Sequence, residues 1–389
     1  MNYSWPFFDQ EQINKVTEVI ASGKVNYWTG DEGKFFEKEF ASWCGTKYAV
    51  AVSNGSVALS LALHALGIKR GDEVIVPPRT FVATASAPAL IGAIPVFVDV
   101  DKNSQAITAN TIEPYITEKT KAICVVHLGG WPADMKSIID LARSKNIAVI
   151  EDCAQAHGAR INNKSVGSFG DVACWSFCQD KIISTLGEGG MITTSRSDLF
   201  EKIWSLKDHG KDRELSLTKV DPKRKEFRWL HKNFGTNLRL TEVQSAVGRI
   251  QLKRLEEWNK RRKENANILT ESLNLCPSVR VPKPINKVNH AWYKFYAFLN
   301  LEKMSHEWSR ARILEELFDD GINAFSGSCG EVYLEESFQK NGFVPTNRLK
   351  VAEELGRTSI MFEVHPTLTE DEMSKRSEKI AKVLKKSLR

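Results

Sequence analysis

A lysine that could do covalent chemistry lies between a predicted strand and a glycine-rich turn. Residues 176–181 read SFCQDK and residues 187–190 read GEGG, after which the apolar segment 191–194 is typical of a strand. A lysine amine held neutral in a dry pocket can form a Schiff base, and a glycine-rich turn lets the backbone approach a bound molecule closely. Taken alone, Lys181 is more typical of a surface lysine, so other residues must decide its role.

Two further segments carry groups that suit a phosphorylated pyridine cofactor. Asp152 follows the apolar segment 147–150, and a carboxylate at a strand end can hold a protonated pyridine nitrogen, which makes pyridoxal 5′-phosphate (PLP) an electron sink. Gln155 lies three residues further on and can reach the phenolic oxygen of such a ring. Residues 53–56 read SNGS at the start of a predicted helix, a fitting place for a phosphate. By itself, Asp152 fits a helix cap or a turn equally well.

The hydrophobic pattern predicts how these residues are positioned. Strands are predicted at 48–52, 73–76, 96–98, 122–127 and 147–150, and helices at 56–66 and 134–145. Strands with crossover helices need a mainly parallel sheet covered on both faces, and ligands collect outside the carboxyl ends of its strands. The candidate site therefore lies where segment 53–56, Thr80, Phe81, His127 and Asp152 follow their strands.

Segments at the two ends of this region predict the organisation of the chain. Asp9 is predicted to cap an N-terminal helix that ends at Gly23. Residues 210–233 are highly charged and predict a long exposed loop. A helix predicted from 241 to 263 is long enough to join two domains, so we expect a large PLP-binding domain with its N-terminal segment at 1–255 and a small domain at 256–389.

Composition excludes several classes of protein. The 389 residues are 42% hydrophobic and 26% charged, as in an ordinary globular enzyme, and no apolar stretch reaches the roughly 20 residues of a membrane helix. No segment looks like a signal peptide, so a cytoplasmic location and no membrane partner are expected. The seven cysteines form no Cys-x-x-Cys pair, which predicts reduced thiols and no metal site. No loop matches an ATP- or NAD-binding motif.

The net charge of +6 is concentrated near the C-terminus. Residues 371–389 hold seven Lys or Arg against three Asp or Glu. Ile380, Val383, Leu384 and Leu388 form a helical stripe within this segment, so the lysines are predicted to be the solvated face of a docked helix. Nucleic acid is therefore not an expected partner.

The chain resembles the DegT/DnrJ/EryC1/StrS family of PLP-dependent sugar aminotransferases, a branch of the fold-type-I aminotransferases. The resemblance covers nearly the whole chain and rests on segments 52–59 (VSNGSVAL), 79–84 (RTFVAT), 151–159 (EDCAQAHGA), 176–190, and 235–240 (GTNLRL) with Glu242, followed by Gln251 and Leu252. It implies an α/β fold, with a mainly parallel seven-stranded sheet flanked by helices in a large domain and a smaller C-terminal α+β domain.

The resemblance also implies a role for each cofactor-binding residue. Lys181 would bind PLP covalently and, once displaced, would move the proton between substrate and cofactor carbons. Asp152 would keep the pyridine nitrogen protonated, Gln155 would bond the ring oxygen and Phe81 would stack on the ring, although Phe81 also fits an ordinary core aromatic. The phosphate would be bound by Gly55, Ser56 and Ser176. Asn237 would come from the neighbouring subunit, which implies a homodimer with active sites at the interface.

Substrate contacts are proposed from position along the chain. The candidates are Asn26, Tyr27 and Trp28 of the N-terminal loop, Arg239, Lys294 and Tyr333. Each of these side chains fits a packing role equally well, and the basic loop at 210–232 is more typical of solvated surface than of a diphosphate site.

The expected reaction moves an amino group from L-glutamate to a UDP- or dTDP-linked keto sugar, with C4 preferred over C3. By resemblance, the product would enter a surface polysaccharide or another glycoconjugate. Two departures from the family pattern stand out: Ser56 replaces a frequent threonine, and Leu186 lies where a glycine or small residue is common. Relatives that dehydrate sugars resemble this pattern with histidine at the lysine position, so Lys181 favours transamination. The alternatives are a PLP-dependent sugar dehydratase or lyase, and a non-catalytic PLP-binding regulatory protein.

Overall fold

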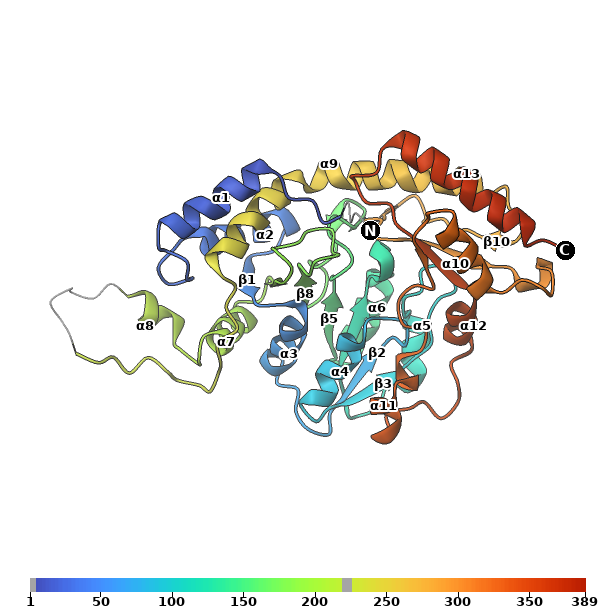
Figure 1. The fold of residues 1–389 in the computed structure, drawn as a ribbon. Helices are drawn as coiled ribbons and strands as arrows, with labels where there is room; N and C mark the ends of the chain where they lie inside the picture. The colour runs from blue at the N-terminus through green and yellow to red at the C-terminus, as the bar shows by residue number, and fades with distance from the viewer. Residues whose placement is uncertain (1–4, 219–225) are drawn as a thin grey trace.

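A seven-stranded sheet forms the centre of the computed structural model, which describes residues 5–218 and 226–389 (Figure 1). β9 runs antiparallel to β1 and β8, whereas the pairs from β8 to β3 are parallel, as a mainly parallel sheet requires. Across the sheet the strands are β1 (Tyr48–Val52), β9 (Gly190–Thr194), β8 (Val172–Ser176), β5 (Ala148–Asp152), β4 (Thr120–Val126), β2 (Glu73–Val76) and β3 (Ile94–Phe97).

Helices cover both faces of this sheet because successive strand residues point to opposite sides. Ala49 and Ala51 of β1 face one core, which α2 (Glu32–Cys44) and the first half of α9 (Glu242–Leu273) complete. Val50 and Val52 face the other core, built with α3 (Gly55–Ala65), α4 (Val82–Leu90), α6 (Met135–Ser144) and α7 (Ser197–Lys207).

The C-terminal part of the chain forms a smaller unit around a four-stranded antiparallel sheet. Its strands are β10 (Val279–Arg280), β12 (Phe295–Leu299), β14 (Ser359–Phe362) and β13 (Ala324–Phe325). The last turns of α9 pack there with α10 (Arg310–Asp319) and α13 (Glu370–Lys386). The proposed domain boundary at residue 255 therefore falls inside α9, whose two halves belong to different cores.

Shorter elements connect these layers. They are α1 (Gln10–Ala21), α5 (Ala109–Ile112), α8 (Arg213–Leu217), α11 (Glu336–Lys340), α12 (Lys350–Thr358), and a small sheet of β11 (Val288–Asn289), β6 (Arg160–Ile161) and β7 (Lys164–Ser165), with single 3₁₀ turns at Glu113–Tyr115, Leu128–Gly130, Leu301–Lys303 and Val332–Leu334. The segment around α8 projects from the body, at the left of Figure 1. Part of the predicted loop 210–233 is thus α8, and its residues 219–225 lie outside the described residues.

Local signals explain several helix ends. Asp9 accepts a hydrogen bond from the backbone of Gln12 and so caps α1, as predicted. A capping box between Thr241 and Gln244 starts α9, which continues to Leu273, ten residues beyond the predicted end. The helices α2 and α4 were not predicted, because α2 holds three of its charged residues in one turn and α4 contains Pro88 within an apolar run that continues into β3.

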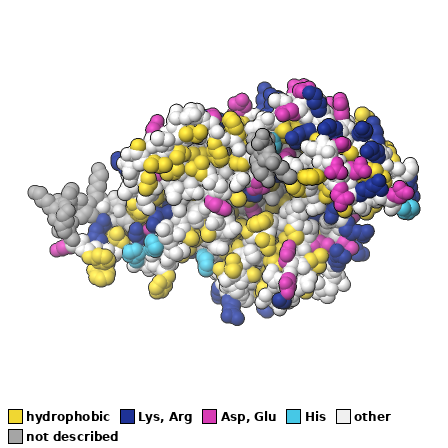
Figure 2. Space-filling model, viewed as in Figure 1, with side chains coloured by type: hydrophobic (Ala, Val, Ile, Leu, Met, Phe, Trp, Pro, Cys, Tyr) yellow, Lys and Arg dark blue, Asp and Glu magenta, His cyan; other side chains and the backbone are white. Residues whose placement is uncertain are grey.

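The C-terminal helix docks as its pattern predicted. Within α13, the side chains of Ile380, Val383 and Leu384 are buried, while those of Lys385 and Lys386 are exposed. Leu388 lies beyond the helix and is half-buried. Figure 2 shows Lys, Arg, Asp and Glu side chains interspersed over this end of the molecule. Among the described residues, no helix combines the length and hydropathy needed to cross a membrane.

Candidate active site

The carboxyl end of β5 places a buried carboxylate at the edge of the sheet. Thr84 Oγ1 donates to Asp152 Oδ2 at 2.7 Å, and the N–H of Ala154 donates to Oδ1 at 3.1 Å. Burial raises the pKa of Asp152, and these two hydrogen bonds and the charge of Lys181 oppose the shift. A cation placed beside this carboxylate would stabilise its charged form, which is what a protonated pyridine nitrogen provides.

The start of α3 and the end of β8 form a narrow cradle. Asn54 accepts from the N–H of Val57 at 3.0 Å and caps α3, while Ser56 in the first turn is exposed. A Cβ on Gly55 would lie 2.7 Å from the Cβ of Ser176, so a residue without a side chain is needed there. The free N–H groups of a helix start beside two serine hydroxyls suit a phosphate.

Two further predicted cofactor residues lie on the turns that follow neighbouring strands. Phe81 comes directly before α4 and is 63% exposed, which is unusual for a phenylalanine beside a buried sheet edge. Its exposure excludes the alternative that it is a core aromatic. Gln155 accepts from the N–H of Gly129 at 2.7 Å, and this bond fixes the orientation of its side-chain amide.

Lys181 lies in the turn after β8, and its ammonium is held by two neighbours. Its Nζ lies 3.2 Å from Asp180 Oδ1 and 3.4 Å from the hydroxyl of Tyr293, and the side chain is 16% exposed. The hydroxyl of Tyr293 in turn donates to Asp180 Oδ2. Burial alone would raise the pKa of Asp180, but the charge of Lys181 and the hydrogen bond from Tyr293 outweigh it and lower this pKa.

The glycine-rich turn after Lys181 needs its glycines at the positions that touch the cradle. A Cβ on Gly190 would lie 2.6 Å from the backbone of Asn54, and Gly189 has φ +154°. Leu186 has φ +60°, the left-handed conformation that favours glycine. A glycine would adopt this conformation without the steric cost that a leucine carries.

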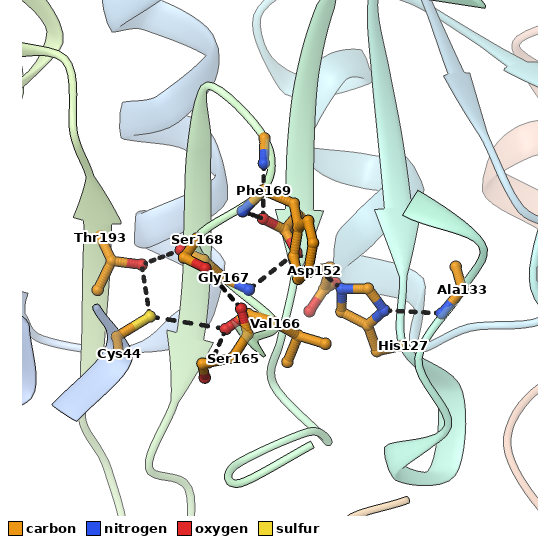
Figure 3. A network of polar contacts seen from close by, with 12 residues as sticks. Cys44, His127, Ala133, Asp152, Ser165, Val166, Gly167, Ser168, Phe169 and Thr193 are labelled. Atoms are coloured by element: carbon orange, nitrogen blue, oxygen red, sulfur yellow. Dashed lines mark hydrogen bonds and ion pairs between the residues drawn. The ribbon is translucent and has the colours of Figure 1, made fainter. Parts of the chain in front are cut away.

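A polar network lies behind Asp152. His127, Glu151 and Cys153 bring three possible metal ligands within 4.8 Å of one another. The two ring nitrogens of His127 already face Glu151 and the N–H of Ala133, each at 3.1 Å (Figure 3). Glu151 also accepts the backbone N–H groups of Gly167, Phe169 and Gly170, each at 2.8 Å. Burial would raise the pKa of Glu151, but His127 and these N–H groups lower it, so the network stabilises the sheet edge through a buried charged carboxylate.

Two of the candidate substrate residues, Trp28 and Arg239, lie close to charged side chains near the cradle. Trp28 lies under Lys211, whose Nζ is 4.4 Å from the ring centroid, and Arg239 donates to the buried Asp208 at 2.8 Å. Leu238, next to Arg239, accepts from the N–H of Ser53 at 2.9 Å, which places this segment beside the cradle. The indole N–H of Trp28 and Nε of Arg239 are buried and have no hydrogen-bond partner among the described residues.

Asn26, Lys294 and Asn237 are oriented by contacts within the chain. Asn26 accepts from the N–H of Trp28 at 2.9 Å and thereby orders the N-terminal loop. Lys294 lies 3.5 Å from Glu363, and burial lowers its pKa. Asn237 is exposed, on the segment that runs past the cradle.

Tyr27 and Tyr333 are buried instead. The ring of Tyr333 packs edge-on against Phe97 at 5.6 Å, and its hydroxyl donates to Glu331. Tyr27 donates to Glu37 at 3.0 Å. Packing explains both tyrosines, because their hydroxyls already have partners in the core.

Four residues of the site were not assigned from the sequence. Thr84 lies in the motif at 79–84, but its contact with Asp152 depends on how α4 packs against β5. Asp180 directly precedes Lys181, a neighbour that could have been noted. Tyr293 comes from a distant segment, and so does Trp5, whose indole N–H donates to the carbonyl of Lys181 at 3.0 Å. Neither residue carries a sequence signal that points to Lys181.

Comparisons with known proteins agree with this arrangement. The sequence model of the DegT/DnrJ/EryC1/StrS aminotransferase family matches residues 6–381. A protein named GDP-perosamine synthase from Escherichia coli O157:H7 is 34% identical over 371 residues, which cover 95% of each chain.

Solved structures are similar over nearly the whole length. An aminotransferase from Psychrobacter cryohalolentis is 48% identical, covers 98% of each chain and has a TM-score of 0.95. An E. coli GDP-4-keto-6-deoxy-D-mannose-3-dehydratase, solved with bound hydrated PLP, is 27% identical over 97% of each chain, with a TM-score of 0.85.

The buried Asp152, the Gly55–Ser176 cradle, the exposed Phe81 and the partly buried Lys181 fit PLP in charge and shape. The chain therefore belongs to the DegT/DnrJ/EryC1/StrS aminotransferase family, and the predicted fold type, PLP cofactor and aminotransferase class are confirmed with it.

Proposed function

We propose that this protein transfers an amino group from L-glutamate to a keto carbon of a nucleotide-linked sugar. The observation that carries the proposal is the partly buried amine of Lys181, set in the turn after β8 with its charge acting on the buried Asp152. A lysine and a carboxylate in this relation suit proton movement on a substrate bound to PLP.

The chain supplies binding, orientation and proton transfer. When bound, PLP supplies an electron sink for the carbon that gains or loses the amino group. Asp152, oriented by Thr84, holds positive charge at the ring nitrogen, while the cradle of Gly55, Ser56 and Ser176 holds the phosphate. Lys181 Nζ would move the proton between the substrate carbon that bears the amino group and the neighbouring carbon of the cofactor.

Lysine at position 181 favours amino transfer over sugar dehydration. A primary amine both accepts and returns a proton and can be bonded to the cofactor reversibly. Dehydrating relatives resemble this motif with histidine at that position, so the similarity to a dehydratase does not change the proposal. Retention of Lys181, Asp152 and Gln155 also disfavours a non-catalytic binding protein.

The sugar nucleotide is proposed to bind beside the cradle, near Trp28, Arg239 and Lys294. Arg239 lies on the segment that runs past the cradle, and a guanidinium suits phosphate oxygens. We propose C4 as the aminated carbon and UDP or dTDP as the nucleotide. Because a similar protein is named for a GDP sugar, GDP belongs in the test as well.

A homodimer is proposed as the active form. Phe227, Trp229 and Phe234 are 74%, 89% and 99% exposed on the segment that leads to Asn237. Large aromatic side chains that are this exposed are typical of an interface, and a second copy that covers them brings Asn237 to a neighbouring cradle.

The absorbance spectrum tests the proposal. The PLP-loaded protein is expected to lose its visible band with L-glutamate and to regain it with one keto sugar from a panel of UDP, dTDP and GDP sugars. Mass spectrometry of the product then identifies the amino sugar. Failure to form a visible band with PLP would overturn the proposal, and release of a deoxy sugar without an amine would point to dehydration.

A further inference from the structure

The backbone of Lys181 is anchored while its side chain remains accessible. The indole N–H of Trp5 donates to the carbonyl of Lys181 at 3.0 Å, and the N–H of Lys181 donates to the carbonyl of Cys178 at 3.0 Å. Trp5 is itself held by Trp258, at 5.0 Å between ring centroids, and by the guanidinium of Arg262 at 5.0 Å. Because the backbone of Lys181 is fixed, its amine can change position only by rotation of the side chain.

The amine is received by a carboxylate and a hydroxyl from two different parts of the chain. Asp180 belongs to the turn after β8, whereas Tyr293 comes just before β12 of the smaller unit. The ammonium of Lys181 donates to both, and it also lies 5.1 Å from the ring centroid of Tyr293. Tyr293 is buried and donates to Asp180, so it orients the carboxylate toward the amine.

We propose that Asp180 and Tyr293 are positioning residues that hold the amine of Lys181 whenever it is not bonded to the cofactor. This rests on the proposed function, in which Lys181 must leave the cofactor and return to it. Holding the released amine through these two contacts keeps it close to the reacting carbon.

Other charges around this pair point the same way. The charge of Lys294 lowers the pKa of Asp180, and the charge of Arg262 lowers that of Tyr293. His157 is neutral because burial lowers its pKa to about 3. Lys294 is paired with Glu363 at 3.5 Å. Asp180 is therefore the carboxylate in contact with the amine of Lys181.

Competitive labelling with acetic anhydride tests the proposal on the full-length chain, freed of cofactor with hydroxylamine. Peptide mass spectrometry measures the labelling of Lys181 at pH 7.5 relative to the exposed Lys136. The contact with Asp180 holds the amine away from the reagent, so Asp180→Asn is expected to speed labelling of Lys181 at least fivefold. Tyr293→Phe is expected to speed it less, because the carboxylate remains, and Asp180→Glu is expected to restore slow labelling in part.

A matched control is Glu363→Gln, which removes the partner of Lys294 and is expected to leave labelling of Lys181 unchanged. An Asp180→Asn rate equal to or below that of the unaltered chain would overturn the proposal. Labelling of the fully buried Lys207 in Asp180→Asn would show that this variant has unfolded. In that case Tyr293→Phe decides, and a Lys181 labelling rate no faster than in the unaltered chain would overturn the proposal. Absence of a visible band after PLP is added to the unaltered chain would instead overturn the proposed function, since labelling does not depend on PLP.

Discussion

Two lysines of this protein lie in contact with a carboxylate and a tyrosine. Lys181 contacts Asp180 and Tyr293, and Lys207 contacts Glu37 at 3.4 Å and the ring of Tyr27 at 3.9 Å. In both groups the tyrosine hydroxyl donates to the carboxylate. The residue types and their contacts are thus nearly the same.

Their surroundings differ. Lys207 ends α7 with no exposed side-chain surface, and Glu37 is 13% exposed, so burial lowers the pKa of this lysine. Lys181 lies in a turn beside the cradle and is 16% exposed, next to Asp180 at 54%. Similar contacts therefore give a fixed internal ion pair in one place and a movable amine in the other, because chemistry requires access for a substrate and room to rotate.

Replacing each lysine by methionine tests this comparison most strongly. Lys181→Met is expected to reduce amino transfer about a thousandfold or more, because the proton-transferring group is lost. Lys207→Met is expected to keep its activity per folded molecule. Steady-state rates, corrected for the folded fraction by circular dichroism, separate the two, and comparable losses in both variants would contradict the distinction.

The two carboxylates should also differ in how much they contribute to stability. Glu37→Gln leaves a buried ammonium without its counter-charge and is expected to lower the free energy of unfolding by about 3 kcal/mol. Asp180→Asn is expected to change it by less than about 1 kcal/mol, since Asp180 is half-exposed. Urea unfolding at pH 7.5 measures both values. Equal losses would show that exposure does not separate the two groups.

His157 extends the comparison to a third buried base, packed against Trp175 and Phe177 beneath the Lys181 turn. Burial lowers its pKa to about 3, from 6.5 in the unfolded chain, so only the unfolded state gains its proton between these values. Stability therefore falls as the pH drops below 6.5. His157→Phe is expected to retain about 2 kcal/mol more stability at pH 5 than the unaltered chain, relative to pH 7.5. Parallel pH profiles of urea unfolding for the two chains would contradict this.

Lys181 lies beside the phosphate cradle, whereas Lys207 does not. A change in this cradle is expected to have the smallest effect, and the effect is on the affinity for PLP. Gly55→Ala would place a Cβ 2.7 Å from Ser176 and is expected to weaken PLP binding about tenfold, or roughly 1.4 kcal/mol. Ser60→Ala, one turn further along α3, is the matched control. Titration of the visible absorbance with PLP measures both affinities, and an unchanged affinity in Gly55→Ala would remove the steric argument for the cradle.

Local sequence signals predicted much of the fold. The bounds of β1 and β2 are as the short runs of apolar residues indicated, and Asp9 caps α1. Such features depend on neighbours within a few residues, so they can be found without the rest of the chain. The predicted order of strands, helices and glycine-rich turns also placed Asp152, Gly55, Ser176 and Lys181 at one edge of the sheet.

The sequence by itself determined where several of the expected cofactor residues lie, because Asp152, Gly55 and Ser176 stand at strand ends or a helix start that local periodicity defines. Tertiary structure alone decided which side chains meet across long separations. Tyr293 reaches Asp180 from 113 residues away, Glu37 pairs with Lys207 from 170 residues away, and Tyr333 is buried against Phe97. These contacts depend on how whole layers pack, and periodicity reports only that a residue is buried, without naming its partner.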